Sequence, residues 1–283
     1  MNVFEKKGAG HHIKNIFIYA ILIFFTLMAL YPLFWLFISS FKTTQEYQLT
    51  SKLAFPQQWW PKNYSDAWVR GNFTTLFFNS IVYTAVSTFA ILICSVAAGF
   101  AFAKLKSKAT NFFYKSFVIG ILITLQCIMI PLFFMANWTG LYDTRLGVII
   151  CYIGIGMPMG VYLATEYIKS IPDSLIESAR IDGAPFMKIF TDIIFPMAKP
   201  VGVTLAIITI TGTWNEFMLV NILASSEKIK SLPVGVQKFS GALASDFGKQ
   251  YAALMISIIP IIIFYLIFRK QITKGVAAGA VKG

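Results

Sequence analysis

Apolar residues fill six long stretches of the chain, and these stretches carry almost no charge. A helix rises about 1.5 Å per residue, so about 20 residues cross the roughly 30 Å of hydrocarbon in a bilayer. The pattern therefore predicts six membrane-spanning helices. The fifth stretch is long enough only if it continues past Glu216 to Ser226. The stretches cover residues 15–41, 71–103, 116–142, 146–165, 200–215 and 250–268.

The same stretches lack the strict alternation of polar and apolar residues that marks a membrane β-strand. Backbone N–H and C=O groups in lipid must then be satisfied inside helices. The first stretch is too long for a signal-peptide core, and no small-residue cleavage site follows it, so we expect it to be retained. We therefore predict an all-α polytopic membrane protein, with six transmembrane helices in one domain over residues 15–268.

Composition agrees with this fold class. Hydrophobic residues make up 57% of the 283 residues, and charged residues only 13%, against about 25% in soluble domains. This excludes an ordinary soluble enzyme, a disordered chain and a disulfide scaffold. The net charge of +12 is also found in nucleic-acid-binding proteins. Here the bases fall between the apolar stretches without forming a dense stripe, so we expect a lipid bilayer, and no nucleic acid, as the partner.

The distribution of Lys and Arg predicts the orientation. If the N-terminus is inside, the inner segments hold 15 of the 24 basic residues and the outer segments hold nine. Positive residues are enriched on the cytoplasmic side, so both termini are predicted to be cytoplasmic. The inner segments are then the N-terminus 1–14, the loop 104–115, the loop 166–199 and the C-terminal tail 269–283, and the outer ones are 42–70, 143–145 and 227–249.

The outer loop 42–70 is rich in aromatic residues, including Trp59, Trp60, Tyr64 and Trp68. Such residues form belts at membrane interfaces. They also pack loops together or contact an external partner, and the sequence leaves these alternatives open.

The inner loop 166–199 differs from the other inner segments, because it has five acids against four bases. A simple connection between two spans does not need 34 residues. Pro172 and Asp173 form a helix start signal, with Asp173 as the expected cap. Gly183 stands where a residue with positive φ would end that helix. Pro185 suits the first turn of a second helix.

Both predicted helices have an apolar side. Leu175, Ile176 and Ala179 form a stripe on the first, and the second has apolar residues at helical spacing. An amphipathic helix of this kind lies on a bilayer surface or serves as a docking element for a soluble partner. The residues of the second stripe are Phe186, Ile189, Phe190, Ile193 and Ile194.

The loop resembles the EAA loop of bacterial ABC-importer permeases, whose pattern is E-A-A-x₃-G-x₉-I-x-L-P. Ser178 replaces one Ala and Phe195 replaces the Leu of that pattern. The flanking residues, and three further stretches, resemble the MalG-like carbohydrate permeases. The loop reads Glu177-Ser178-Ala179, three residues, Gly183, nine residues, Ile193, one residue, Phe195 and Pro196. The further stretches are Asn79-Ser80, Trp214-Asn215-Glu216-Phe217 and residues 275–283.

This resemblance covers nearly the whole chain and implies the type I (MetI-like) ABC-importer permease fold. It implies a heterodimer with a homologous, MalF-like permease in a bacterial plasma membrane. Two ATPase subunits would dock on the EAA loops, and an extracytoplasmic binding protein would deliver a sugar or oligosaccharide. The implied docking residues in this chain are Glu177, Ser178, Ala179, Asp182 and Gly183.

The chain has no phosphate-binding loop of the form G-x₄-G-K-[S/T]. The nearest string, Gly248-Lys249, lacks the upstream Gly and the Ser or Thr. A catalytic constellation is also missing from the sequence. We therefore expect a transport subunit rather than an enzyme, with no cofactor or metal of its own, and with ATP and Mg²⁺ on the partner ATPase.

The fifth stretch suggests a substrate pathway. An acid deep in a membrane segment is costly unless it faces water or a partner, which makes Glu216 a functional candidate. An aromatic face packs on a sugar ring, and amides and acids bond its hydroxyls. The alternative is that Asn215 and Glu216 hold neighbouring helices together. The candidate residues are Thr211, Trp214, Asn215, Glu216 and, in the third stretch, Gln126.

Two other transport functions remain open at this point. The first is an ABC permease for a polyamine, an amino acid or phosphate, because the loop motif is shared widely. The second is an ion-coupled carrier, which typically has several intramembrane ionisable groups and internal repeats. The spans contain one acid and no evident repeat, which favours the ABC permease.

Overall fold

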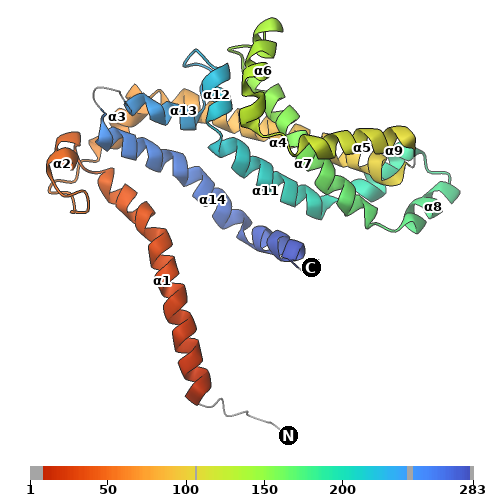
Figure 1. The fold of residues 1–283 in the computed structure, drawn as a ribbon, viewed down its shortest axis with the longest axis horizontal. Helices are drawn as coiled ribbons and strands as arrows, with labels where there is room; N and C mark the ends of the chain where they lie inside the picture. Colours follow the sequence, from red (N-terminus) through yellow and green to blue (C-terminus); the bar gives the residue numbers. More distant parts are fainter. Residues whose placement is uncertain (1–8, 106, 241–244, 281–283) are drawn as a thin grey trace. The chain divides into compact units, whose positions relative to one another are not determined.

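The computed structural model describes residues 9–105, 107–240 and 245–280, with the side chains of 9–14 and 273–280 left out. Of the predicted N-terminal segment 1–14 and tail 269–283, residues 1–8 and 281–283 lie outside the described residues, and the backbone of 269–280 continues helix α14 beyond the predicted end of the last span. Every regular element in the described part is a helix (Figure 1). The elements are α1 (Ala9–Ser39), α2 (Thr44–Leu49), α3 (Lys62–Arg70), α4 (Phe73–Lys104), α5 (Lys108–Gly120), α6 (Leu125–Trp138), α7 (Arg145–Lys169), α8 (Asp173–Ile181), α9 (Phe186–Ile189), the π-helix η1 (Phe190–Ile194), α10 (Phe195–Met197), α11 (Lys199–Asn215), α12 (Met218–Leu223), α13 (Leu232–Val236), the 3₁₀ turn η2 (Gln237–Phe239) and α14 (Phe247–Ala280).

Four helices of the described part are each long and apolar enough to cross a membrane: α1, α4, α7 and α14. Two further pairs qualify only if each bent pair is one span. These are α5 with α6, bent by 106°, and the α9–α10 segment with α11, bent by 68°. The predicted stretch 116–142 is therefore not one straight span, because it is bent between Gly120 and Leu125. The stretch 200–215 is a single helix, α11, but it ends at Asn215 instead of continuing past Glu216, and its bend lies before Lys199.

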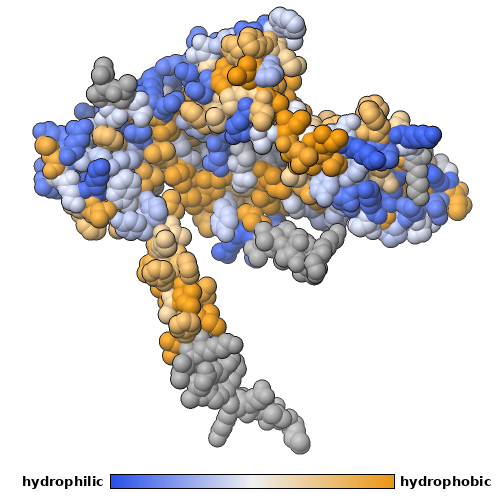
Figure 2. All heavy atoms as spheres, viewed as in Figure 1, coloured by the Kyte–Doolittle hydropathy of each residue, from blue (hydrophilic) through white to orange (hydrophobic). Residues whose placement is uncertain are grey.

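The chain folds into two compact units, the first of which contains residues up to Gly71 together with Phe239–Ile256. In this unit the side chains of α1 are mostly exposed and apolar, as a lipid- or protein-facing span requires (Figure 2). The C-terminal end of α1 packs through Trp35 against Tyr47 and Tyr251, at ring-centroid distances of 6.4 and 5.3 Å. Tyr251 donates a hydrogen bond to the Tyr47 hydroxyl over 2.6 Å.

The aromatic residues of the predicted outer loop 42–70 fall into two groups. Tyr64 is packed inside the unit, where its hydroxyl lies 2.7 Å from Ser40 Oγ. Burial raises the pKa of the Tyr64 phenol, and this Ser40 hydrogen bond opposes the rise. Trp59, Trp60 and Trp68 are 54%, 41% and 40% exposed. The loop-packing alternative therefore describes Tyr64 and also Trp59, whose ring lies 5.1 Å from that of Phe41. The exposed parts of the three indoles leave the membrane-interface and partner alternatives open.

The second unit, Asn72–Lys238 with residues from Ser257 onward, is built around α4, α7 and α11. Helices α4 and α7 approach closely at small residues. A Cβ added at Gly99 would lie 2.8 Å from the Cβ of Ala164 and 2.9 Å from the Thr165 backbone nitrogen. One added at Gly160 would lie 2.2 Å from Ser95 Oγ. Small residues let helix backbones approach in membranes, so these positions hold α4 and α7 together as one body.

Candidate functional site

The EAA loop forms two helical limbs at one end of the second unit. Helix α7 runs to Lys169, one turn further than predicted, and α8 begins at Asp173 after three residues. Asp173 is the first helical residue and not the expected cap, since the N-cap is Pro172. The Asp173 carboxylate instead pairs with the Lys104 ammonium at the end of α4, over 2.7 Å.

The first limb ends at Gly183, as predicted. Gly183 has φ +78°, a conformation that costs an L-residue with a side chain about 1–2 kcal/mol. Its N–H donates to the Arg180 carbonyl over 3.0 Å, and the Ala184 N–H donates to the Ala179 carbonyl over 2.9 Å. This pair of bonds is a Schellman motif, which satisfies the last carbonyls of α8. The turn therefore requires Gly for its backbone conformation.

The second limb starts after Pro185 and runs through α9, η1 and α10. Ile189 and Ile194 are buried, at 1% and 0% exposed. The π-turn places these residues, five apart, on the same side, which a regular α-helix would not do. The predicted apolar stripe is thus confirmed as a face, with one π-turn inside it.

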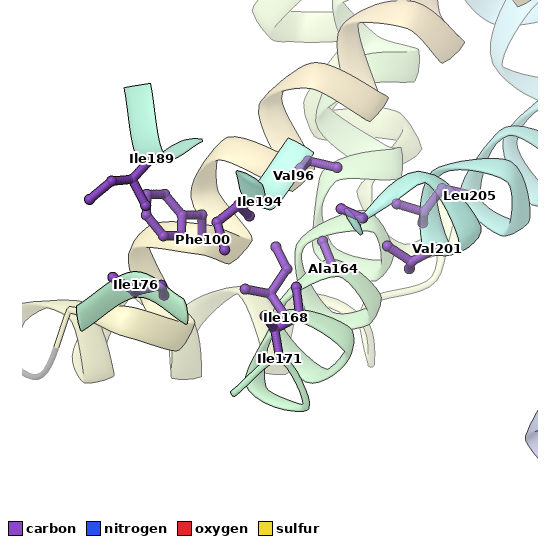
Figure 3. Close-up of a cluster of buried hydrophobic side chains, with 11 residues drawn as sticks. Val96, Phe100, Ala164, Ile168, Ile171, Ile176, Ile189, Ile194, Val201 and Leu205 are labelled. Carbon is purple, nitrogen blue, oxygen red and sulfur yellow. The ribbon is translucent and has the colours of Figure 1, made fainter. Parts of the chain in front are cut away.

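The apolar faces of both limbs pack on the protein and not on a bilayer surface. Figure 3 shows Phe100 of α4 between Ile176 of α8 and Ile189 of α9. The Phe100 ring stacks on Phe186 at 4.7 Å and on Phe190 at 5.7 Å. The cluster continues into α7 and α11 through Ala164, Ile168, Val201 and Leu205. The bilayer-surface alternative therefore does not describe this loop.

The predicted docking residues mostly lie on the opposite, exposed face. Glu177, Ser178, Asp182 and Gly183 are exposed, and Ala179 is half-buried against the cluster. Figure 2 shows a largely hydrophilic surface around α8 and α9. On α8 two apolar side chains interrupt this surface, Leu175 at 42% and Ile181 at 86% exposed. Leu175 belongs to the predicted apolar stripe, of which Ile176 is the buried member, and Ile181 follows Glu177 by four residues and so lies on the same face.

The predicted pathway residues are not gathered at one site. Trp214 is buried, with its ring 5.8 Å from Phe77 and its Nε1–H donating to the Ser257 carbonyl over 3.3 Å. Asn215 is exposed and its amide bonds the Thr211 carbonyl of the same helix over 2.9 Å. The Thr211 hydroxyl bonds the Ile207 carbonyl, and Gln126 is exposed on α6.

Glu216 joins three helices. Its Oε2 accepts a hydrogen bond from the Tyr152 hydroxyl of α7 over 2.9 Å, and its Oε1 accepts the Leu219 N–H over 2.7 Å. The Val220 N–H reaches Oε2 over 3.4 Å. Glu216 thus satisfies the free N–H groups that start α12, which is the bonding that the structural alternative expects.

Glu216 also lines a cavity of about 260 Å³ between α4, α7 and α11. Thr209, Thr213 and Tyr152 add hydroxyls to a wall that is mostly apolar. The remaining lining residues are Ile91, Ile155, Gly156, Met159, Gly160, Leu205, Ile208 and Gly212. Of the five predicted pathway residues, Glu216 alone lines this cavity.

A family model described as a binding-protein-dependent transport system inner membrane component matches residues 90–277, which include α8, α11 and both limbs of the EAA loop. The chain belongs to this family.

Individual relatives are similar over nearly the full length of this permease. It is 37% identical to the multiple sugar-binding transport system permease protein MsmG of Streptococcus mutans, over 90% of this chain and 93% of that one. It is 30% identical to the melibiose/raffinose/stachyose import permease MelC of Bacillus subtilis, over 89% and 91%. A crystal structure of a bacterial ABC transporter that imports alginate contains a chain of TM-score 0.80 and 26% identity, covering 93% of this chain and 98% of that one.

These matches confirm the predicted ABC-importer permease and its all-α, multi-pass membrane fold.

The Asn79-Ser80 stretch of the permease has a structural role that the sequence did not indicate. The Asn79 amide nitrogen donates to the carbonyls of Lys228 and Lys230, over 2.8 and 2.9 Å. Ser80 Oγ accepts the Leu232 N–H over 2.8 Å. Together they fix the backbone of residues 228–232, which we call the latched loop.

Three other side chains hold the latched loop and the residues before it. The Tyr83 hydroxyl donates to the Ile229 carbonyl over 2.6 Å, and Arg145 donates to the Lys228 carbonyl over 3.3 Å. Asp143 accepts the Ser226 N–H over 2.8 Å. A charged hydrogen bond from Lys238 lowers the pKa of Glu227. The roles of Tyr83, Asp143 and Arg145 are not visible in the sequence, because their partners are distant along the chain.

Proposed function

We propose that this permease pairs with a homologous permease and translocates a sugar or oligosaccharide handed over by an extracytoplasmic binding protein. Two partner ATPases supply the energy, one of them docked on α8. The observation that carries this proposal is the seating of α8: its apolar face is fixed to α4, α7 and α11, while Glu177 and Asp182 face outward. Relatives with sugars in their names support the substrate class.

The orientation follows from this docking. The end of the second unit that carries α8 faces the cytoplasm, and both termini are cytoplasmic, in a bacterial plasma membrane. The 15 basic residues in the segments on this side, against nine on the other, support the assignment. The latched loop then faces the binding protein.

ATP and Mg²⁺ are held by the partner ATPases, and this chain contributes motion. Closure of the ATPase pair moves α8, and the packed cluster carries this movement into α4, α7 and α11. The pathway then switches between inward and outward access, because each state is stabilised by different contacts. The exposed Ile181 and Leu175 give the docked surface apolar contacts beside the charged ones of Glu177.

The test is purification of the tagged permease from membranes of its own host, followed by uptake in reconstituted vesicles. We expect an ATPase and a second permease to co-purify. We expect ATP-dependent uptake of at least one labelled sugar from a panel of raffinose, melibiose and N,N′-diacetylchitobiose. Uptake of labelled putrescine, glutamine or phosphate in place of every sugar would assign another solute. Uptake that follows an ion gradient without ATP would overturn the proposal.

A further inference from the structure

Lys104 is the last residue of α4 and is almost enclosed, with 6% of its side chain exposed. Its ammonium donates to the Ile171 carbonyl over 2.6 Å and to Asp173 Oδ1 over 2.7 Å. Ile171 lies just after α7, and Asp173 begins α8. One side chain therefore ties together the end of α4, the end of α7 and the start of α8.

The same turn of α4 also holds the second limb of the EAA loop. Phe100 precedes Lys104 by four residues, so both project from one face of α4. Phe100 stacks on Phe186 and Phe190, while Lys104 holds α8. A single turn of α4 thus contacts both limbs of the loop, one through apolar stacking and the other through a charged hydrogen bond.

A movement of the docked ATPase can reach the membrane spans only if α8 is rigidly connected to α4 and α7. Packing of Ile176 in the apolar cluster holds the middle of α8. The Lys104 contacts hold the connection before α8 and its first residue, where the helix would otherwise pivot on α7. They attach the first residue of α8 to α4. Helix α4 in turn packs closely against Ala164 and Thr165 of α7 at Gly99.

We propose that Lys104 is a positioning residue for energy coupling, which makes α8 move with α4 and α7 as one rigid body. Lys104 transmits the movement of α8 to α4 and α7. The ATPase itself is contacted by the exposed face of α8. The inference rests on the proposed docking of the ATPase on α8. It assigns to a residue of α4, 73 positions before Glu177 in the sequence, a function in the coupling of ATP hydrolysis to transport.

The test uses the full reconstituted importer and compares Lys104→Met with Lys104→Arg. Met preserves the apolar stem and removes the ammonium, whereas Arg keeps a charged donor. We expect the Met variant to retain its ATPase but to lose about tenfold in binding-protein-stimulated ATP hydrolysis per assembled complex, in the range of typical coupling energies. The Arg variant should recover most of this stimulation. Lys108→Met, at an exposed lysine that starts α5, is the control and should behave as the wild type.

Asp173→Asn provides a second measurement if Lys104→Met does not assemble. This variant keeps the Ile171 bond and loses the ion pair, so we expect a loss of stimulation between those of the Arg and Met variants. Normal stimulation per complex in both Lys104→Met and Asp173→Asn would overturn the inference, as would a loss that only reflects fewer complexes. If the docking itself is wrong, substitutions at Glu177 and Gly183 will also leave ATPase association unchanged, which separates the two failures.

Discussion

Asn79 of α4 and Arg145 of α7 share a hydrogen bond of 2.9 Å, and both also bond the carbonyl of Lys228. The Asn79 carboxamide thus makes three hydrogen bonds, one accepted from Arg145 and two donated to the latched loop. An amide in this position couples two membrane helices to the backbone of a loop between α12 and α13.

We expect Asn79→Leu to release the latched loop, because the Lys230 carbonyl loses its Asn79 donor and the Lys228 carbonyl keeps only the bond from Arg145. Each lost hydrogen bond costs about 0.5–1.5 kcal/mol. Trypsin should then cut after Lys228 and Lys230 in the purified variant, whereas the same two bonds should resist cleavage in the wild type. Asn221→Leu, at an exposed Asn of α12, is the matched control. Equal protection of the Asn79 and Asn221 variants would show that the latch does not hold the loop.

Gly183→Asp should leave membrane insertion intact while it strongly reduces ATPase co-purification and sugar uptake. The variant places a charged side chain with unfavourable φ on the exposed docking face. Gly140→Asp is a close control, since Gly140 has a similar φ of +70° and equally open space around its missing Cβ. Association should be measured by pull-down of the ATPase. Equal loss in both variants would indicate general misfolding in place of a docking defect.

Glu216→Ala should lower the thermal stability of the purified permease, because Tyr152 and the first N–H groups of α12 lose their acceptor. We expect a loss of about 2–4 kcal/mol from these hydrogen bonds to a charged group. Asn215→Ala should be nearly neutral, since the Asn215 amide is exposed and bonds only its own helix. An altered sugar preference in Glu216→Gln, without loss of assembly, would favour the pathway role instead.

Gly160→Val should destabilise the pair α4–α7, because its Cβ would lie 2.2 Å from Ser95 Oγ and 3.2 Å from Ile91 Cγ2. Overpacking of this kind costs about 1–3 kcal/mol. Gly154→Val, six residues earlier on α7, meets nothing within 4 Å and serves as control. Thermal unfolding in detergent measures both. Ser95→Gly should partly rescue Gly160→Val, and a lack of rescue would argue against this contact as the cause.

Much of the fold follows from the order of residues. The long apolar stretches predict α1, α4, α7 and α14 within a few residues at most ends, and Gly183 ends α8 as expected. These features depend on short-range patterns, because hydrophobic run length and turn chemistry are local. Gly156 and Gly160 pack closely, as glycines in a span usually do, whereas Gly154 does not.

The features that the sequence does not reveal depend on distant partners. Asp173 has a sequence context typical of a helix cap. Its ion pair with Lys104 forms only because the tertiary fold brings the end of α4 to the start of α8. The bend between Gly120 and Leu125 lies inside a continuous apolar run, where neither Pro nor charge marks it. Trp214 and Glu216 belong to the same short motif. Trp214 is nevertheless buried against Phe77, whereas Glu216 accepts hydrogen bonds from the first N–H groups of α12.

The latched loop is held through its main chain, since Asn79, Tyr83 and Arg145 all bond carbonyl oxygens. Such bonds do not depend on which side chains the loop carries. The side chain of Lys228, which is exposed, can therefore be exchanged without loss of the loop's conformation. The chemistry that this surface presents and the framework that shapes it are thus set by different residues of the permease.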